Sequence, residues 1–210
     1  MYCSEECKAS DWKKYHDVEC AVFPTVLKMD FVKLDLLSLR VAIQAVREAT
    51  SIEELRNELK EVDNWDDPRT KGFTKDGIFL SNRFRSVLGL ATNTEKRSVQ
   101  DLFRRSIDSC VLLYFVATRT NMFGSPLKDF SDLINNADVT FFGGLILRNQ
   151  QIIPTNGHSC TEERGLEAVE RKIALLPFLS LCNHSCNPNV SRCSKSEYIV
   201  SHAICPIKKG

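Results

Sequence analysis

Apolar side chains recur every three or four residues through much of the first 140 positions, a spacing that places them on one face of a helix. The pattern predicts a helix over Val26–Thr50, which contains neither Gly nor an internal Pro. Further helix starts are predicted at Ser51, which has capping-box spacing to Glu54, at Ser98 for a helix through Ala117, and at Ser125-Pro126 for a short helix to Asn135. The middle of the chain is therefore predicted to be helical.

The pattern changes in the last third of the chain. Phe141–Ile153 is apolar but interrupted by Gly143-Gly144, and it fits either a helix or a strand. Leu175–Leu181 is an apolar run broken by Pro177, and Glu197–Ile204 is rich in residues that favour strands. Helices first and strands late predict an α+β chain.

Polar residues between these segments indicate loops and charged faces. Asp63–Gly77 is dense in Asp, Pro and Gly, which predicts a loop. Residues 53–67 carry seven acidic and two basic side chains, whereas residues 83–105 carry six basic and two acidic ones. We expect these runs to be solvated helix faces of opposite sign.

Composition excludes several classes of protein. With 210 residues, 43% hydrophobic and 26% charged, the chain falls in the ordinary globular range. It has no apolar run long enough to cross a bilayer, and its net charge of +1 does not favour direct nucleic-acid binding. Without a secretory signal at its start, we expect a cytoplasmic or nuclear location.

Nine cysteines, an odd number, do not suggest a secreted disulfide scaffold and raise the question of metal binding. Most lie near the two ends of the chain. Cys110 is isolated in the apolar run CVLLYFVA, and we expect it to pack there as a small hydrophobic residue.

The first twenty residues contain two pairs of metal-ligand type, Cys3-x3-Cys7 and His16-x3-Cys20. Residues four apart on a helix share a face, and zinc accepts thiolate and imidazole ligands. The four side chains could close one Cys3His site, form two half-sites that bind metal weakly, or be incidental residues of an amphipathic helix. We favour the half-sites, and expect Met1–Cys20 to be poorly ordered beyond its helix because zinc binding is largely folding energy in such small modules.

Near the other end, LLPFLSLCNHSCNPNV (Leu175–Val190) places polar groups directly after an apolar run. Such groups can fix a polar ligand at the end of a buried element. Two other interpretations are an Asx-rich loop and a local zinc site made by the nearby cysteines and His184 (Cys182, Cys186 and Cys193).

Both stretches resemble known families. YCSEECKASDWKKYHDVEC resembles the C-terminal half of a MYND zinc finger, and NHSCNPN resembles the NHSCxPN signature of SET-domain lysine methyltransferases. The run FLSL and the segment SEYIVSHAICPIKKG resemble the strand and turn that flank this signature. Together, in this order, they resemble the SET-and-MYND (SMYD) family, in its SMYD4-like or arthropod-type branch.

The resemblance implies a protein-lysine N-methyltransferase that uses S-adenosylmethionine. Asn183 and His184 would contact this cofactor, Ser180 would line its pocket, and Asn156 matches an upstream cofactor residue. The implied zinc ligands are Cys3 and Cys7 for one ion of the MYND finger and His16 and Cys20 for the other. Cys186 matches a cysteine that binds a separate structural zinc together with three post-SET cysteines. A lysine of a histone or another protein would be the substrate, and a proline-rich peptide a possible partner of the MYND finger.

By the same resemblance, residues 1–20 form a partial MYND finger, 21–140 a helical linker and SET insert, and 141–210 a SET core. The fold expected is an α+β chain with a mostly helical middle that leads into an incomplete SET-type β-fold. The family's catalytic tyrosine would lie beyond Gly210, and Tyr114 and Tyr198 are expected to pack in their own elements. We therefore expect an incomplete piece that is inactive alone; the alternatives are an interaction scaffold without catalysis and a simple zinc-stabilised domain.

Overall fold

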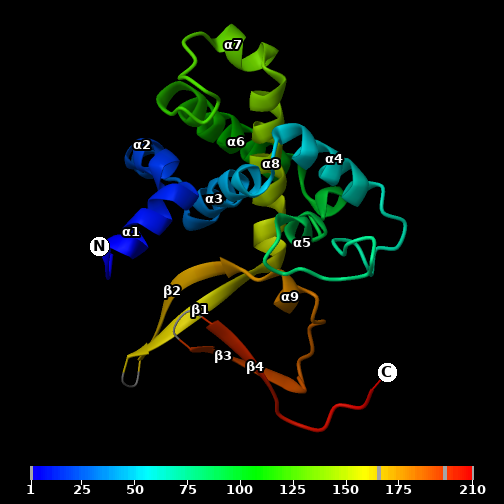
Figure 1. Ribbon diagram of the computed structural model, residues 1–210. Coiled ribbons are helices and arrows are strands. Elements are labelled where there is room, and N and C mark those ends of the chain that lie inside the picture. Colours follow the sequence, from blue (N-terminus) through cyan, green and yellow to red (C-terminus); the bar gives the residue numbers. More distant parts are fainter. Residues whose placement is uncertain (1, 165–166, 196–197, 210) are drawn as a thin grey trace. The chain divides into compact units, whose positions relative to one another are not determined.

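The computed structural model describes the backbone of residues 2–164, 167–195 and 198–209. Within these ranges, the side chains of residues 160–172 and 194–198 are not described. The chain divides into two compact units, Met1–Asn156 and Gly157–Gly210. The described part of the first unit is built from helices and that of the second mainly from strands, as Figure 1 shows. The predicted α+β class is confirmed at this level.

A helical run opens the first unit. It consists of α1 (Glu5–Asp11), one π-helical turn (Trp12–His16), α2 (Asp17–Val26) and a 3-10 turn (Leu27–Met29). The Ser4 hydroxyl caps α1 by accepting a hydrogen bond from the Cys7 amide at 3.1 Å. The segment expected to be poorly ordered beyond its helix is therefore helical from Glu5 onward.

The helix predicted over Val26–Thr50 is interrupted. Asp30 has a left-handed backbone (φ 60°), and α3 (Lys33–Glu48) begins only after it. The Val32 amide donates to the Asp35 carboxylate at 3.1 Å, which satisfies one of the free donors at the start of α3. The apolar period continues across the break, which is why the pattern did not reveal it.

Two predicted helix starts are confirmed. Ser51 caps α4 (Ile52–Asp63) and Ser98 caps α6 (Val99–Arg119), each hydroxyl accepting from the amide three residues later at 3.1 Å. The loop predicted after Asp63 is also present, and leads to the short helix α5 (Phe84–Leu88). A 3-10 turn (Thr94–Lys96) follows α5.

Three expectations about the helical region are wrong. The helix expected at Ser125-Pro126 begins at Phe130 instead, as α7 (Phe130–Asn135) with Asp129 as its N-cap. Cys110 is exposed rather than packed, and Tyr114 is 46% exposed. Both lie on α6, which turns its small buried face (Leu112, Val116) to the core and leaves the apolar side chains of Val99 and Phe103 exposed as well.

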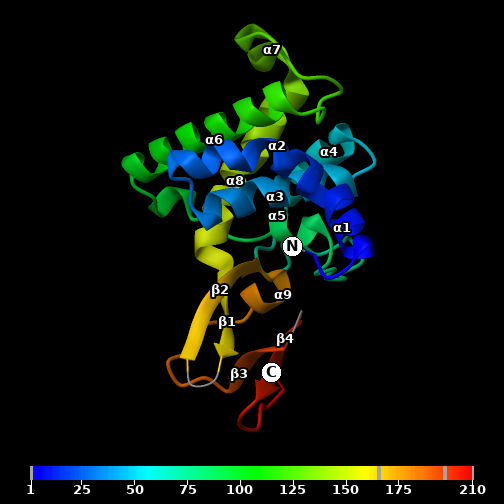
Figure 2. The same cartoon turned by 90° about the vertical axis from the view of Figure 1, so that its left-hand side faces the viewer.

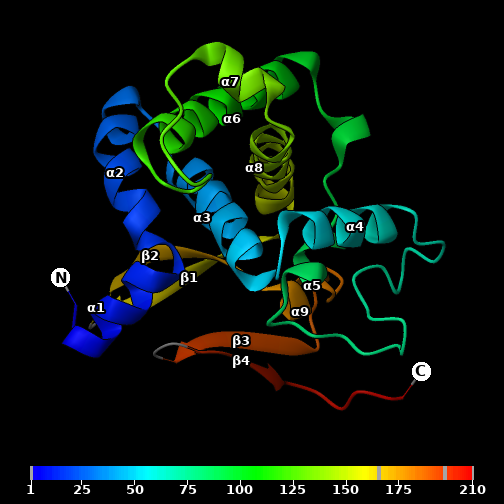
Figure 3. The same ribbon diagram turned by 45° about the horizontal axis from the view of Figure 1, so that its top comes forward.

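Helix α8 (Ala137–Asn156) is central to the helical unit. It packs against both α3 and α6, and Figure 3 shows it nearly end-on between them. Its buried side chains include Phe142, Ile146 and Ile153, and Phe142 meets the Phe123 ring edge-on at 5.5 Å between centroids. The ambiguous stretch Phe141–Ile153 is thus helix, and Gly143 allows close approach because an added Cβ would lie 2.8 Å from the Leu113 side chain.

The unit from Gly157 contains two antiparallel hairpins, visible in Figure 2. β1 (Gly157–Arg164) pairs with β2 (Glu167–Leu175), with a register shift between Cys160 and Thr161. β3 (Val190–Lys195) pairs with β4 (Tyr198–Ala203). The strand predicted at Glu197–Ile204 is confirmed as β4, while Glu197 and the Tyr198 side chain lie outside the described part of the structure.

The segment FLSL differs from expectation. It resembles a family strand in sequence but forms part of a single helical turn, α9 (Pro177–Ser180), with Pro177 in its first turn. Proline favours this position because its missing amide needs no partner at a helix start.

The expected start of a SET core at residue 141 falls within α8, and the compact units meet after Asn156. Phe142 and Ile146 are buried in the helical unit, which explains the difference. The three domain ranges themselves stay predictions. None of the described helices is long and apolar enough to cross a membrane.

Candidate functional site

The loop between α9 and β3 carries the Asn183-His184 motif. Asn183, His184 and Cys186 are all exposed. Ser185 and Asn187 hold the loop in a tight turn: the Ser185 hydroxyl donates to the Asn187 carbonyl at 2.9 Å and accepts from the Asn187 amide at 3.2 Å. The loop therefore presents an amide and an imidazole side chain to solvent on a short, internally bonded segment.

Ser180, at the end of α9, is held by two partners. Its hydroxyl donates to the Leu176 carbonyl at 3.0 Å and lies 3.2 Å from His158 Nε2. His158 Nδ1 lies in turn 2.6 Å from Arg192 Nη1. These contacts join β1 to α9 and β3, the two elements that flank the candidate loop.

The contact with Arg192 determines which nitrogen of the His158 imidazole carries the proton. A guanidinium can only donate, so Nδ1 must accept and the neutral imidazole carries its proton on Nε2. Nε2 then donates to Ser180, which in turn donates to Leu176. His158 cannot act as a base toward Ser180 in this arrangement, which excludes a Ser–His nucleophile here.

Burial lowers the pKa of His158, and the positive charge of Arg192 lowers it further. Both effects disfavour the protonated ring. Sequence reasoning did not single out His158 or Arg192, because they are 22 and 12 residues from Ser180 along the chain. β1 and β3 belong to different hairpins, and their packing against each other, which no local pattern specifies, brings the two residues together.

Asn156 has a different position from the other cofactor candidates. It ends α8, and its amide nitrogen donates to the carbonyls of Ala91 at 2.9 Å and Ile152 at 2.8 Å. Both amide hydrogens are thus used within the helical unit. Ser180, Asn183 and His184 belong to the other unit, so the structure gives Asn156 a role in ending α8.

Two of the four N-terminal metal candidates lie close together. The Sγ atoms of Cys3 and Cys7 lie 3.2 Å apart, and both residues are exposed. His16 packs edge-on against the rings of Tyr2 and Trp12, with centroids 6.2 and 5.7 Å away. Cys20 is exposed on α2.

No group of three or more His, Cys, Asp or Glu side chains arranged for a metal occurs among the described residues. The two thiols fit half of a tetrahedral zinc site but not a closed one. At the other end of the chain, Cys186 Sγ lies 3.5 Å from His184 Nε2. The local zinc site considered for Cys182, His184, Cys186 and Cys193 is not assembled here.

Tyrosine positions bear on catalysis. Hydrogen bonding to Asp11 raises the pKa of Tyr2 to about 12, and burial raises that of Tyr15 to about 12. Tyr114 is on α6, also in the helical unit. Three of the four tyrosines therefore belong to a different unit from the candidate loop.

The SET domain family matches residues 30–210, which include α3, α8 and the whole candidate loop. Among curated proteins, the chain is 25% identical over 229 residues to the mouse protein-lysine N-methyltransferase SMYD4, covering 90% of this chain. It is also 25% identical over 251 residues to the human protein of that name, and 24% identical over 218 residues to the zebrafish one.

The chain spans less than a third of the length of these relatives: 28% of the mouse protein and 31% of the human one. The segment that resembles half of a MYND finger, residues 1–20, lies before the matched residues. The match covers most of the chain and both compact units. The chain therefore belongs to the SET domain family.

Proposed function

We propose that this chain is part of an S-adenosylmethionine-dependent protein-lysine N-methyltransferase, with the loop around Asn183 and His184 as its cofactor contact. The single observation that carries the proposal is this loop: two exposed polar side chains on a tightly turned segment, inside the region that matches the SET domain. The methyltransferase names of the relatives support the same reaction class.

The residues of the loop fit the chemistry of this cofactor. An amide both donates and accepts, as recognition of an adenine edge requires, and an imidazole can meet a carboxylate or a ring face. Ser180 already bonds to Leu176 and His158, so its role would be to orient the loop. Asn156 is a weaker candidate because both its amide hydrogens are used elsewhere.

When bound, the cofactor supplies an electrophilic methyl group on a sulfonium centre. The protein's task is then to align a neutral lysine amine with that methyl group and to exclude water. We also propose that these 210 residues bind the cofactor weakly and do not turn it over alone, because the chain spans less than a third of the length of the methyltransferases that it matches.

A nuclear magnetic resonance titration tests this proposal. Adding S-adenosylmethionine to the ¹⁵N-labelled chain should shift the amides of Cys182–Cys186, and Asn183→Ala should weaken binding by about tenfold through loss of hydrogen bonds to the ligand. Asn189→Ala, at the end of the same loop, is the matched control and should bind as the unaltered chain does. Methyl transfer to a lysine peptide, followed with labelled cofactor, should stay at background.

Shifts that avoid the loop, or binding unchanged by Asn183→Ala, would contradict the site. Robust methylation by the chain would contradict the claim of inactivity. Saturating cofactor without any shift would favour the non-catalytic scaffold as the function of this SET body.

We also propose that Cys3 and Cys7 supply a zinc half-site that holds metal weakly. Two thiolates offer half the ligands of a structural site, and affinity falls accordingly. Equilibrium dialysis of the chain should detect weak zinc binding that Cys7→Ser abolishes. One tightly held zinc ion would show that His16 and Cys20 join the pair. Recognition of a proline-rich peptide by this segment stays a prediction.

A further inference from the structure

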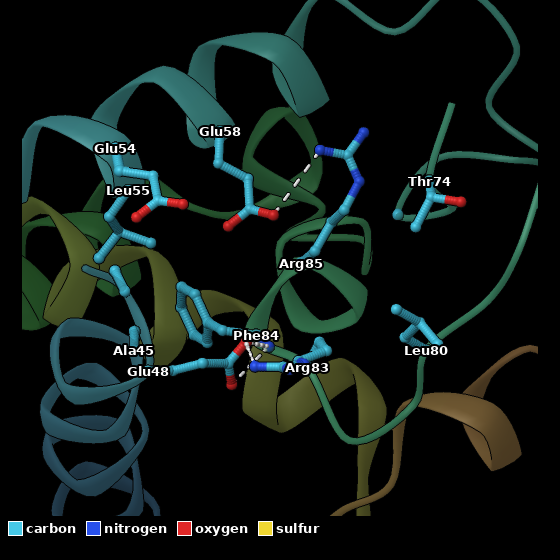
Figure 4. Close-up of a pocket in the computed structure, with 12 residues that line it drawn as sticks. Ala45, Glu48, Glu54, Leu55, Glu58, Thr74, Leu80, Arg83, Phe84 and Arg85 are labelled. Atoms are coloured by element: carbon cyan, nitrogen blue, oxygen red, sulfur yellow. Dashed lines mark hydrogen bonds and ion pairs between the residues drawn. The ribbon is translucent and has the colours of Figure 1, made fainter. Parts of the chain in front are cut away.

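A pocket of about 240 Å³ lies in the helical unit, away from the candidate loop in the chain. It is lined by α3, α4, α5 and the loop that precedes α5, as Figure 4 shows. Its apolar lining includes Ala45, Leu55, Leu80 and Phe84. Its size is below the roughly 300–1,000 Å³ of pockets for drug-sized ligands, so it suits a single side chain.

Three carboxylates also line this pocket: Glu48, Glu54 and Glu58. Glu48 accepts from the Phe84 amide at 3.0 Å, and Glu54 accepts from the Thr50 amide at 2.8 Å. Glu58 differs from both. Its nearest guanidinium nitrogen, Arg85 Nη1, is 3.7 Å away, too far for a hydrogen bond.

Arg85 and Arg83 also line the pocket, and each forms an ion pair with a pocket carboxylate, Arg85 with Glu58 and Arg83 with Glu48. Arg85 donates to Glu61 at 2.6 Å and to the Phe73 carbonyl at 2.7 Å. Arg83 is 3.9 Å from Glu48, and its side chain is 57% exposed. Glu61 lies beside them and also pairs with Lys75 at 3.2 Å, so four carboxylates face three cationic groups, which leaves an excess of one negative charge.

Glu58 experiences this excess most strongly. Burial raises its pKa; Arg85 lowers it, while Glu48, Glu54 and Glu61 raise it further. A cation placed beside Glu58 would offset the repulsion from these neighbouring carboxylates. Figure 4 shows the Glu54 and Glu58 side chains descending from α4 on the same side of the pocket as Leu55.

We propose that this pocket binds the side chain of a lysine carried by a partner protein. The aliphatic stem would pack against Leu55, Leu80 and Phe84, and the ammonium would bond to Glu58 and Glu54. Lysine fits better than arginine because an ammonium is compact and needs no planar fork of acceptors. The pocket volume admits one side chain, so the partner's backbone stays outside.

This inference goes beyond the proposed methyl transfer and does not depend on it. All pocket residues belong to Met1–Asn156, whereas Ser180, Asn183 and His184 belong to the other unit. A lysine bound here is an anchor that holds a partner, and it is not modified. The acidic run at residues 53–67, expected as a solvated face, thereby gains a binding role.

The test uses the full chain and a five-residue peptide, acetyl-Gly-Gly-Lys-Gly-Gly-amide, with a norleucine peptide of equal stem length as the uncharged control. In a titration followed by amide shifts, the lysine peptide should perturb Leu55, Thr74 and Phe84 in a saturable manner. The norleucine peptide should bind at least about tenfold more weakly, since charge-assisted hydrogen bonds to a carboxylate are lost. Equal binding of the two peptides would overturn the proposal.

Two pocket variants and one control variant test whether the peptide binds in this pocket. Glu58→Gln should weaken the lysine peptide by about tenfold, whereas Glu53→Gln is the matched control on α4, because Glu53 pairs with Arg56 at 2.8 Å outside the pocket. Leu80→Ser should also weaken binding; Leu80 is 42% exposed, so the change leaves the core intact. Unchanged binding by Glu58→Gln would overturn the proposal.

Free n-butylammonium distinguishes the source of the amine. It should perturb the same amides as the lysine peptide. If it alone binds and the peptide does not, the pocket takes free amines, and the partner-protein proposal is wrong.

Discussion

The two compact units stabilise themselves in different ways. In Met1–Asn156, α3, α6 and α8 bury large side chains such as Leu39, Leu112 and Phe142. In Gly157–Gly210, Pro177 is the single buried residue among those whose side chains are described. Two-stranded hairpins bury little apolar area and are marginal by themselves. Packing thus dominates the first unit, and hydrogen bonds around a polar loop dominate the second.

The largest expected effect concerns a buried ion pair in the helical unit. Glu19 is fully buried and receives two hydrogen bonds from Arg40, at 2.6 and 2.7 Å. Arg40→Met removes both hydrogen bonds and leaves the buried carboxylate with His16 Nδ1 at 3.7 Å, which we expect to cost about 3 kcal/mol in urea unfolding. The double variant Glu19→Gln with Arg40→Met should recover much of this loss. A cost below about 1 kcal/mol for the single variant would show that packing in this unit tolerates an unpaired charge.

A glycine contact gives the next largest effect. A Cβ added at Gly89 would lie 2.5 Å from the Lys71 carbonyl oxygen and 2.7 Å from Gly72 Cα, and both of these are backbone atoms that cannot move aside easily. We expect Gly89→Ala to destabilise the helical unit by about 2–3 kcal/mol. Gly144 is the matched control, since its added Cβ meets nothing within 4 Å. Gly144→Ala should stabilise α8 by about 0.5–1 kcal/mol; equal losses at both sites would contradict close packing at Gly89.

The helical unit also buries a polar side chain without pairing its polar atoms. Gln150 is 1% exposed, and its Oε1 and Nε2 have no hydrogen-bond partner among the described residues. Gln150→Met keeps the volume and removes the unmet polar groups, so we expect a gain of about 1 kcal/mol. A loss in urea unfolding would indicate that Gln150 is satisfied by buried water.

The smallest effect is expected in the sheet unit and depends on pH. Burial and then Arg192 lower the pKa of His158, so the unfolded chain binds this proton more tightly than the folded one. Its contribution to stability is present above the unfolded pKa of about 6.5 and is lost as pH falls toward the folded value. An imidazole resonance titration should show the low pKa, and Arg192→Gln should raise it. If Arg192→Gln leaves the pKa of His158 unchanged, the charge of Arg192 does not lower it.

Local signals predicted the helical unit well because its helices begin with their own caps. Ser51 and Ser98 each mark a helix start in sequence and cap it in the structure. The break at Asp30 was missed because one left-handed residue leaves the apolar period intact. Cys110 was misplaced because an apolar run does not say which side of α6 faces the core.

The site was predictable only as a motif. The string around Asn183 indicated a polar ligand, and family resemblance named it, but the contacts of His158 with Ser180 and Arg192 depend on how β1, α9 and β3 pack, which no local pattern specifies. The same applies to Asn156, whose two donors reach Ala91 and Ile152. Charge runs at 53–67 and 83–105 were expected to be solvated, yet Arg85 pairs with Glu61 at 2.6 Å.

The most direct test of the central claim is the affinity of the chain for S-adenosylmethionine, measured by calorimetry for the unaltered chain, Asn183→Ala and Asn156→Ala. The account predicts weak binding that Asn183→Ala reduces by about tenfold, because Asn183 meets the ligand. Asn156→Ala should lower the stability of the helical unit and leave the affinity of the folded chain unchanged. The opposite result, in which Asn156→Ala loses affinity for S-adenosylmethionine and Asn183→Ala keeps it, would contradict the proposed cofactor site.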